Sequence, residues 1–401
     1  MSKQGLSVVL TTVVLDVLAL ALVAPVLPQL VLHFLHGQTS EAALVYGLFG
    51  TVWALMQFIF SPVQGALSDR YGRRPVIVLS NLGTGLDYIL MALAPALWVL
   101  MVGRVLNGIT SASISTASAY VADTMPPDRR SAGFGMIGAA FGVGFVIGPA
   151  MGGLLGGIEP RLPFWVAAGL SLANALYGLI VLPESLPVDR RAAFAWKRAN
   201  PIGMLSLLSV NARLAGLATI SFATFLAQQA LPAVFVLYSV HRFGWSTGTI
   251  GWSLAGFGAC SAIVGWRVGP VVRLFGERRA LLAGLLGGAC GFAVLGLAPA
   301  GWIFWLGIPV LSLWGLEAAA IQSLMTLQVG ASEQGRLQGA RSSLIGLATL
   351  IGPGVFTSLF AVALDNAAPA VLLGAPFLAA AVLRFAAFVA AARVTRQCRI
   401  A

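Results

Sequence analysis

The chain has little charge, little cysteine and little histidine. Only 9% of its 401 residues are charged and three are histidines, whereas soluble domains carry about 25% charged residues. The three cysteines, Cys260, Cys290 and Cys398, lie far apart in the sequence, which favours packing roles over a disulfide framework or a metal cluster. These shortages exclude a soluble globular domain and a disulfide-stabilised scaffold.

Motifs for nucleotide and metal chemistry are also missing. The chain has no Gly-Lys pair, which excludes the phosphate-binding loop of an ATP-driven pump. Residues 133–138 fit the letters of a dinucleotide motif, but they open an apolar run with no strand before it. His33, His36 and His241 have no metal-site spacing. We therefore expect a protein that is not an enzyme.

Apolar residues dominate what is present, at 58% of the chain with a mean hydropathy of +0.91. A membrane-spanning helix needs roughly 20 apolar residues. The first run has no cleavage-site pattern after it and is expected to be a retained span. Apolar runs bounded by proline, glycine and charge predict twelve spans, at 6–32, 42–64, 76–94, 97–122, 132–157, 162–182, 212–238, 249–268, 280–298, 303–325, 337–362 and 369–391.

The distribution of Lys and Arg predicts the orientation of these spans. Nineteen of them lie in segments on the side of the N-terminus, and only Arg161 and Arg242 lie in the opposite loops. The positive-inside rule then places both termini in the cytoplasm. The expected location of the chain is the inner (plasma) membrane of the cell. The net charge of +11 is scattered over short loops, so the lipid bilayer is an expected partner and nucleic acid is not.

The spans form two similar sets of six. The longest polar stretch divides them and predicts a first half at 1–183, a cytoplasmic linker at 184–211 and a second half at 212–401. Residues 65–75 read GALSDRYGRRP, and residues 269–279 at the equivalent place read GPVVRLFGERR, with glycines at the same spacing followed by basic residues. The pattern predicts a duplicated six-helix unit.

A glycine series marks the fifth span. Gly144, Gly148-Pro149 and Gly152 stand at helical spacing, and Gly352-Pro353-Gly354 gives an echo in the eleventh span. Small residues let helices approach closely, and a mid-membrane Gly-Pro bends a helix where a neighbour must slide. Static close packing is the alternative interpretation.

The residues at 65–74 resemble the signature loop of the major facilitator superfamily, and the span-five glycines resemble the motif of its drug-exporting antiporters. A longer series is similar to the tetracycline-efflux branch and covers nearly the whole chain: Leu15-Asp16, Pro25 to Pro28, Gln57 before Ser61-Pro62, Asp87-Tyr88, Gly103-Arg104, Gly108 to Thr110, Ala122-Asp123, Pro183 to Ser185, Arg242-Phe243 and Ile250-Gly251.

The resemblance implies a monomeric two-lobe helical bundle without a cofactor, which exchanges a cytoplasmic drug for external protons. It implies that a tetracycline-type substrate can travel as a divalent-metal complex, and that Asp16, Asp69, Arg70, Asp87 and Arg104 matter for transport. Two positions depart from that branch: its span-nine carboxylate aligns with Gly288, and its span-eight histidine aligns with Ser261.

Six ionisable residues fall inside the expected spans, namely Asp16, Asp87, Arg104, Arg267, Glu317 and Arg384. Each costs about 2.5–3.5 kcal/mol at a helix centre, so each should face a cavity or a partner. We expect Arg267 and Arg384 to extend to the membrane surface, and Asp16, Arg104 and Glu317 to bind protons or substrate. For Asp87 a structural and a functional role are equally open.

Glu317 is the deep carboxylate that remains in the second half. We hypothesise that it is a compensating acid or a cation-binding residue, and the alternative is a structural pair with Arg267 or Arg104. Gln57 and Gln322 are expected to add polar lining to the substrate path.

The signature loop and the glycine series are expected to form the gate. We expect a bond between Arg70 and Asp123, and we expect the span-five glycines to pack against the opposite half. The full set of expected gating residues is Gly65, Asp69, Arg70, Gly72, Arg73, Arg74, Asp123, Gly144, Gly148, Pro149 and Gly152. A transporter of the same fold that carries a metabolite such as a sugar or an organic acid is the alternative function.

Overall fold

The computed structural model describes residues 3–111, 113–126, 130–191, 207–208, 211–330, 334–365, 369 and 371–395. Most of the expected linker and Cys398 lie outside this set. The regular structure of the described residues is helical throughout, and twelve helical segments are long and apolar enough to cross a membrane. The expected all-α architecture with twelve spans is confirmed.

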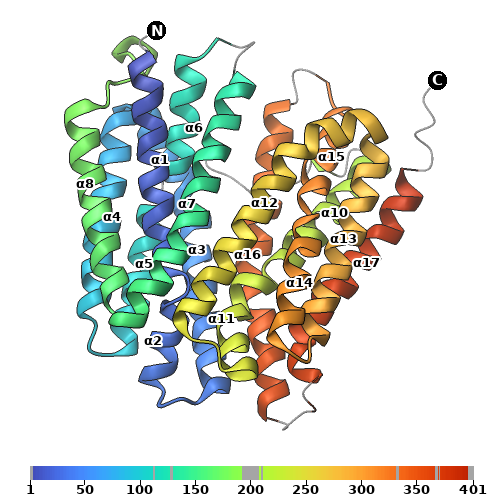
Figure 1. Cartoon of the computed structure of the whole chain (residues 1–401). Coiled ribbons are helices and arrows are strands. Elements are labelled where there is room, and N and C mark those ends of the chain that lie inside the picture. Colours follow the sequence, from blue (N-terminus) through green and yellow to red (C-terminus); the bar gives the residue numbers. More distant parts are fainter. Residues whose placement is uncertain are drawn as a thin grey trace. The chain divides into compact units, whose positions relative to one another are not determined.

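The helices follow one another in the order shown in Figure 1. The first half contains α1 (Lys3–Val23), α2 (Leu27–Phe34), α3 (Thr39–Tyr71), α4 (Arg73–Leu93), α5 (Leu97–Thr110), α6 (Ser113–Thr124), α7 (Arg130–Ile158), α8 (Leu162–Val181) and the short η2 (Val188–Arg190). The second half contains α10 (Ala212–Gln228), α11 (Ala230–Phe243), α12 (Thr247–Phe275), α13 (Glu277–Leu297), α14 (Gly301–Ser312), α15 (Gly315–Thr326), α16 (Gln334–Asp365), η6 (Leu372–Gly374) and α17 (Ala375–Val394).

The helices of the two halves correspond to one another. Helices α4 and α13 each have 21 residues, and each follows a glycine with positive φ, Gly72 at 106° and Gly276 at 79°. A positive φ favours glycine because it has no side chain to clash with the backbone. The neighbours also match: α1 packs on α7 as α10 packs on α16, and α4 packs on α8 as α13 packs on α17. The predicted duplication is present in the structure.

Helix α4 shows how a membrane protein distributes its side chains. Leu79, Leu86 and Leu93 are more than half exposed, at 64%, 55% and 59%. The opposite face carries Asn81 and Asp87, which are 0% and 1% exposed. Because lipid solvates leucine and does not solvate amides or carboxylates, the polar groups of this helix are placed inside the protein.

The chain forms two compact units that exchange helix ends. Unit 1 comprises Met1–His36, Val52–Asn200 and Trp245–Gly258, and unit 2 comprises Gly37–Thr51, Pro201–Gly244 and Ala259–Ala401. The start of α12 therefore belongs with the first half, where a methyl group at Gly251 would lie 2.8 Å from the Gly153 Cα of α7. The start of α3 belongs with the second half, where a methyl group at Gly50 would lie 2.9 Å from the Pro353 Cβ of α16.

Candidate functional site

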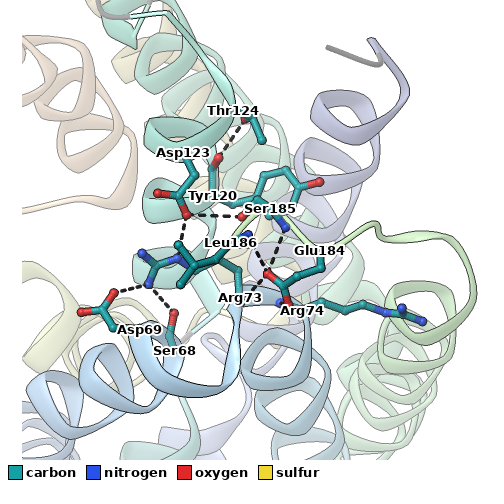
Figure 2. A network of polar contacts seen from close by, with 10 residues as sticks. All are labelled: Ser68, Asp69, Arg73, Arg74, Tyr120, Asp123, Thr124, Glu184, Ser185 and Leu186. Carbon is teal, nitrogen blue, oxygen red and sulfur yellow. Dashed lines mark hydrogen bonds and ion pairs between the residues drawn. The ribbon is translucent and has the colours of Figure 1, made fainter. Parts of the chain in front are cut away.

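Arg73 is the centre of a polar network at the turn between α3 and α4 (Figure 2). Its Nη1 donates to the Asp69 Oδ1 at 2.6 Å and to the Ser68 Oγ at 2.7 Å. Its Nε donates to the Asp123 Oδ2 at 2.8 Å. One guanidinium therefore joins the last turn of α3 to the last turn of α6, and charge-assisted bonds of this kind are among the stronger ones in proteins.

Glu184 completes this network from the segment after α8. Its carboxylate accepts hydrogen bonds from the backbone N–H groups of Arg73 at 2.8 Å and Arg74 at 3.3 Å. It also accepts from the backbone N–H groups of Ser185 and Leu186, at 2.9 and 3.0 Å. A carboxylate at this place satisfies the unpaired N–H groups at the start of α4 and complements the positive end of its dipole.

Gly72 lets Glu184 approach the turn. Its φ of 106° lies in the region that favours glycine, and a methyl group there would overlap the Glu184 carboxylate. Arg74 extends the same anchorage, because its Nη2 donates to the Leu179 carbonyl of α8. Gly65 has open space around its Cα, so its small size is not required by close packing here.

The expected bond between Arg70 and Asp123 is wrong. Asp123 accepts instead from Arg73, and also from the Ser185 Oγ at 3.3 Å. Arg70 is exposed, and its guanidinium lies over the ring of Tyr71 at 5.2 Å. The turn at Gly72 reverses the chain, so that the first residue of α4 rather than the last turn of α3 faces Asp123.

A second polar cluster lies inside unit 1, between α3, α4 and α5. The Asn107 Nδ2 donates to the Asp87 Oδ2 at 2.9 Å. The Asn107 Oδ1 accepts from the Trp53 Nε1 at 2.9 Å and from the Ser111 Oγ at 3.3 Å. Asp87 and Asn107 are each 1% exposed, so this amide connects a buried carboxylate to an indole of another helix.

Two glycines of α5 make room for this cluster. A methyl group at Gly103 would lie 2.9 Å from the Asp87 Oδ1, and one at Gly108 would lie 2.7 Å from the Trp53 carbonyl. Glycine at these positions allows α5 to approach α4 and α3 closely. The chain therefore brings the buried carboxylate, the amide and the indole together.

Arg104 and Asp16 belong to the same neighbourhood. The Arg104 guanidinium lies over the Trp53 ring at 5.3 Å, a cation–π contact. The Tyr88 phenol interacts electrostatically with Asp16, Asp87 and Arg104. The Asp87 Oδ1 is buried and accepts no hydrogen bond from the described residues. Three of the expected charged residues thus lie within electrostatic range of one tyrosine, and the Asp87 Oδ1 has no donor among the described residues.

The second half contains a buried ion pair. The Arg384 Nη1 of α17 lies 2.7 Å from the Glu317 Oε2 of α15, and the two side chains are 0% and 3% exposed. Arg384 was expected to extend to the membrane surface, and that expectation is wrong. The structural alternative for Glu317 was a pair with Arg267 or Arg104, but Glu317 pairs with Arg384. Arg267 is exposed and lies over Trp266 at 4.9 Å.

The two predicted glutamines lie apart from the charged groups described above. Gln322 is exposed on α15, and its Oε1 accepts from the Arg341 Nη1 of α16. Arg341 also lies over the Phe225 ring at 5.6 Å. Gln57 is half-buried on α3, one turn after Trp53.

The span-five glycines pack against α1 and not against the opposite half. Methyl groups at three glycines of α7 would collide with α1, Gly144 with Val17, Gly148 with Ala21 and Gly152 with Leu22. Helix α7 continues through Pro149 without a break. On α7, Gly153 and Gly156 face the start of α12: methyl groups there would lie 2.8 Å from the Gly251 Cα and 3.1 Å from the Thr247 Cγ2. Helix rotation decides this, because neighbouring glycines point about 100° apart.

Known proteins share the sequence pattern and the fold of this chain. The sequence matches the Major Facilitator Superfamily over residues 9–353. The chain belongs to this superfamily. The resemblance seen in the signature loop is thereby confirmed, and the chain is a multi-pass membrane transporter.

Relatives within the superfamily are close in sequence and length. The class C tetracycline resistance protein of Escherichia coli is 39% identical over 361 residues, which is 90% of each chain. The class G tetracycline resistance protein of Vibrio anguillarum is 38% identical over 359 residues, 89% of this chain and 91% of the relative. The crystal structure of the human organic anion transporter MFSD10 (TETRAN) has a TM-score of 0.73 at 25% identity and covers 97% of this chain and 99% of that one.

The sequence interpretation assigned no functional role to Trp53, and it used Tyr88 and Glu184 only as part of the resemblance. A signal for Glu184 was present in its position just after the sixth span, where a carboxylate can reach the start of α4. Trp53 carried no such signal, because a tryptophan in an apolar run is usually a packing residue. Among the described residues no group of three or more His, Cys, Asp and Glu could hold a metal ion.

Proposed function

We propose that this chain exports a tetracycline-class drug from the cytoplasm in exchange for protons. It works as a single chain in the inner (plasma) membrane, with both termini in the cytoplasm and without a resident cofactor. The names and coverage of the relatives support the drug class. The distribution of Lys and Arg supports the orientation.

The observation that carries the proposal is the Asp87 cluster. A proton antiporter needs a carboxylate that is shielded from bulk water and can exchange its proton during the cycle. Asp87 is buried, is held by Asn107 and has one oxygen that accepts from no donor among the described residues. Asp16 and Arg104 lie in the same electrostatic neighbourhood. The first half therefore offers acids for the proton and a cation for a polar substrate group.

The Arg73 network fits the gate of such a carrier. Under the proposed orientation, the turn between α3 and α4 lies at the cytoplasmic surface. The guanidinium holds the ends of α3 and α6 together, and its two carboxylate partners are exposed and partly exposed, whereas Ser68 is buried. Alternating access requires that helix ends separate and rejoin, and charged groups at a surface can exchange their partners for water during that step.

A drug panel in an efflux-deficient bacterial host tests the proposal. Expression of the chain should raise the resistance to tetracycline and lower its accumulation in the cells, and a protonophore should restore the accumulation. Everted membrane vesicles should take up tetracycline only when a pH gradient is present. Uptake of a sugar or an organic acid with no drug transport would support the alternative function, and uptake of tetracycline without any gradient would contradict proton coupling.

A further inference from the structure

Glu317 and Arg384 form an ion pair that excludes water from both charges. The Arg384 Nη1 and the Glu317 Oε2 are 2.7 Å apart, and the side chains are 0% and 3% exposed. The Arg384 Nε and Nη2 are also buried and have no acceptor among the described residues. A single charge at this depth would be costly, and a partner of opposite sign offsets part of that cost. The pair is therefore electrically neutral as a unit.

The pair joins α15 to α17, and residues of α13 and α10 together with Trp314 lie around it. On α13, Gly288 leaves the space that the arginine fills, because a methyl group there would lie 3.1 Å from the Arg384 Cδ and would overlap its Nη1. The guanidinium lies over the rings of Trp314 at 5.1 Å and Phe292 at 5.8 Å. On α10, the Thr224 hydroxyl contacts the Glu317 carboxylate. An arginine enclosed by aromatic rings has little freedom to leave its partner.

Other charged groups on the helices around Glu317 lie elsewhere. On α16, Arg341 binds Gln322 and lies near the Ala318 carbonyl at 3.5 Å. Glu277 lies in the first turn of α13, where it accepts a hydrogen bond from the Ser323 hydroxyl of α15. Arg213 lies in the first turn of α10. Among the described residues, Arg384 is the charged group that contacts the Glu317 carboxylate.

We infer that Arg384 is the permanent counter-ion of Glu317, so that the second half supplies neither a proton carrier nor a cation site to the transport cycle. A carboxylate that is paired with a guanidinium in an apolar site gains nothing from a proton unless the pair breaks. The same holds for a cationic substrate or a metal complex. The inference rests on the proposed function, and it leaves proton exchange to the first-half acids, Asp16 and Asp87.

The first test does not depend on transport. N,N′-dicyclohexylcarbodiimide is apolar and reacts with protonated carboxyl groups inside membranes. In native membranes from about pH 6 to about pH 8, we expect no label on Glu317 in the wild-type chain and clear label in Arg384→Gln, as measured by mass spectrometry of the peptides. Equal labelling of Glu317 in both proteins would overturn the inference.

The second test measures proton coupling. The full chain, Glu317→Gln/Arg384→Gln and Asp87→Asn are reconstituted in liposomes, with tetracycline as the probe. The double variant should accumulate tetracycline in response to a pH gradient within about twofold of the wild type, whereas Asp87→Asn should lose the response. Loss of the gradient response in a folded double variant would overturn the inference.

An apolar replacement of the pair covers the case in which the double variant does not fold. Glu317→Met/Arg384→Met removes both charges, keeps the site neutral and fills it with side chains of similar length. It should transport with the same pH-gradient response as the wild type, and transport that no longer responds to the gradient would contradict the inference. If the wild-type chain moves no tetracycline, the proposed function fails, and the carbodiimide result alone decides the role of Arg384.

Discussion

At the scale of the residue, position within a turn decides which arginine matters. Arg70, Arg73 and Arg74 follow one another closely, yet they have different partners. Arg73 contacts two carboxylates and a hydroxyl, Arg74 donates to a carbonyl of α8, and Arg70 lies over its neighbour Tyr71. The difference follows from the turn at Gly72, which places Arg73 at the start of α4 facing back toward α3.

Arg73→Ala should therefore impair transport far more than Arg70→Ala. The first change removes three hydrogen bonds of a charged donor. The bond to the buried Ser68 is worth about 1.5–3 kcal/mol, and the bonds to the more exposed Asp69 and Asp123 about 0–1 kcal/mol each. The matched control removes an exposed cation–π contact worth about 0.5–1 kcal/mol. Tetracycline uptake into everted vesicles, normalised to the protein in the membrane, measures both. Equal losses in the two variants would contradict the assignment of Arg73 as the centre of the network.

Asn107 is the residue on which the Asp87 cluster depends. Asn107→Ala would leave the Asp87 Oδ2 and the Trp53 Nε1 without their partners, at about 1–3 kcal/mol for each buried group. We expect a lower thermal midpoint in detergent together with a loss of pH-driven uptake. Ser111→Ala is the control, because it removes only the 3.3 Å bond to the same amide. A wild-type midpoint and wild-type uptake in Asn107→Ala would show that the cluster is not needed.

The sequence was sufficient to find the buried charges but not their partners. A charge in an apolar run is visible at once because it is costly there. Which groups meet depends on the rotation of each helix and on glycines, whose missing side chains leave space for a neighbouring residue. Arg384 could reach Glu317 because Gly288 has no side chain, and no local pattern around Arg384 reveals this.

At the scale of the element, four of the spans that the structure describes are interrupted helices. The interruptions separate α1 from α2, α5 from α6, α10 from α11 and α14 from α15. The first break includes Pro25, where a missing N–H disrupts the helix. Asp16, Arg104 and Glu317 all lie on these interrupted spans. Half-helices that end within a membrane are typical of transporter sites, because the broken backbone must face protein or a cavity.

Hydropathy predicted the spans well and their interruptions poorly. The twelve expected ranges overlap the twelve observed spans, because length and apolarity are read directly from the sequence. The breaks at Gln229 and at Leu313-Trp314 occur among residues that also occur inside helices. Hydropathy also does not show which neighbouring helix each glycine faces. For that reason the prediction that Gly144, Gly148 and Gly152 pack against the opposite half was wrong.

Close contact between α7 and α1 gives a test at this scale. Gly152→Ala would place a methyl group against the Leu22 carbonyl, and overpacking of this kind costs about 1–3 kcal/mol. Gly142→Ala on the same helix is the matched control, because nothing lies within 4 Å of its added methyl group. The thermal midpoint of the purified protein should fall for the first variant only. Equal midpoints would mean that α7 and α1 can separate freely.

At the scale of the whole molecule, the sequence halves and the compact units differ at two helix ends. The start of α3 packs in unit 2, and the start of α12 packs in unit 1. The contacts that hold these ends use residues of both sequence halves, such as Gly47 with Thr357 and Gly153 with Gly251. Hydropathy and repeats could not predict this exchange, because it depends on the conformation of the folded chain. Transport by alternating access requires such contacts to form and break.

Cross-linking one of these contacts should arrest transport. A Cβ at Gly47 would lie 3.0 Å from the Thr357 Cβ, close to the range of about 3.5–4.5 Å found in disulfides. We expect oxidised Gly47→Cys/Thr357→Cys to form the bond and to lose tetracycline uptake, and a reducing agent to restore it.

The matched pair is Gly216→Cys/Val394→Cys, which joins α10 to α17 within one half at a Cβ separation of 3.8 Å. Its oxidation should leave uptake unchanged, because helices of one half move together when the halves rock. Continued uptake by the cross-linked Gly47→Cys/Thr357→Cys protein would show that α3 and α16 stay together throughout the cycle, and the moving contact would then have to lie elsewhere.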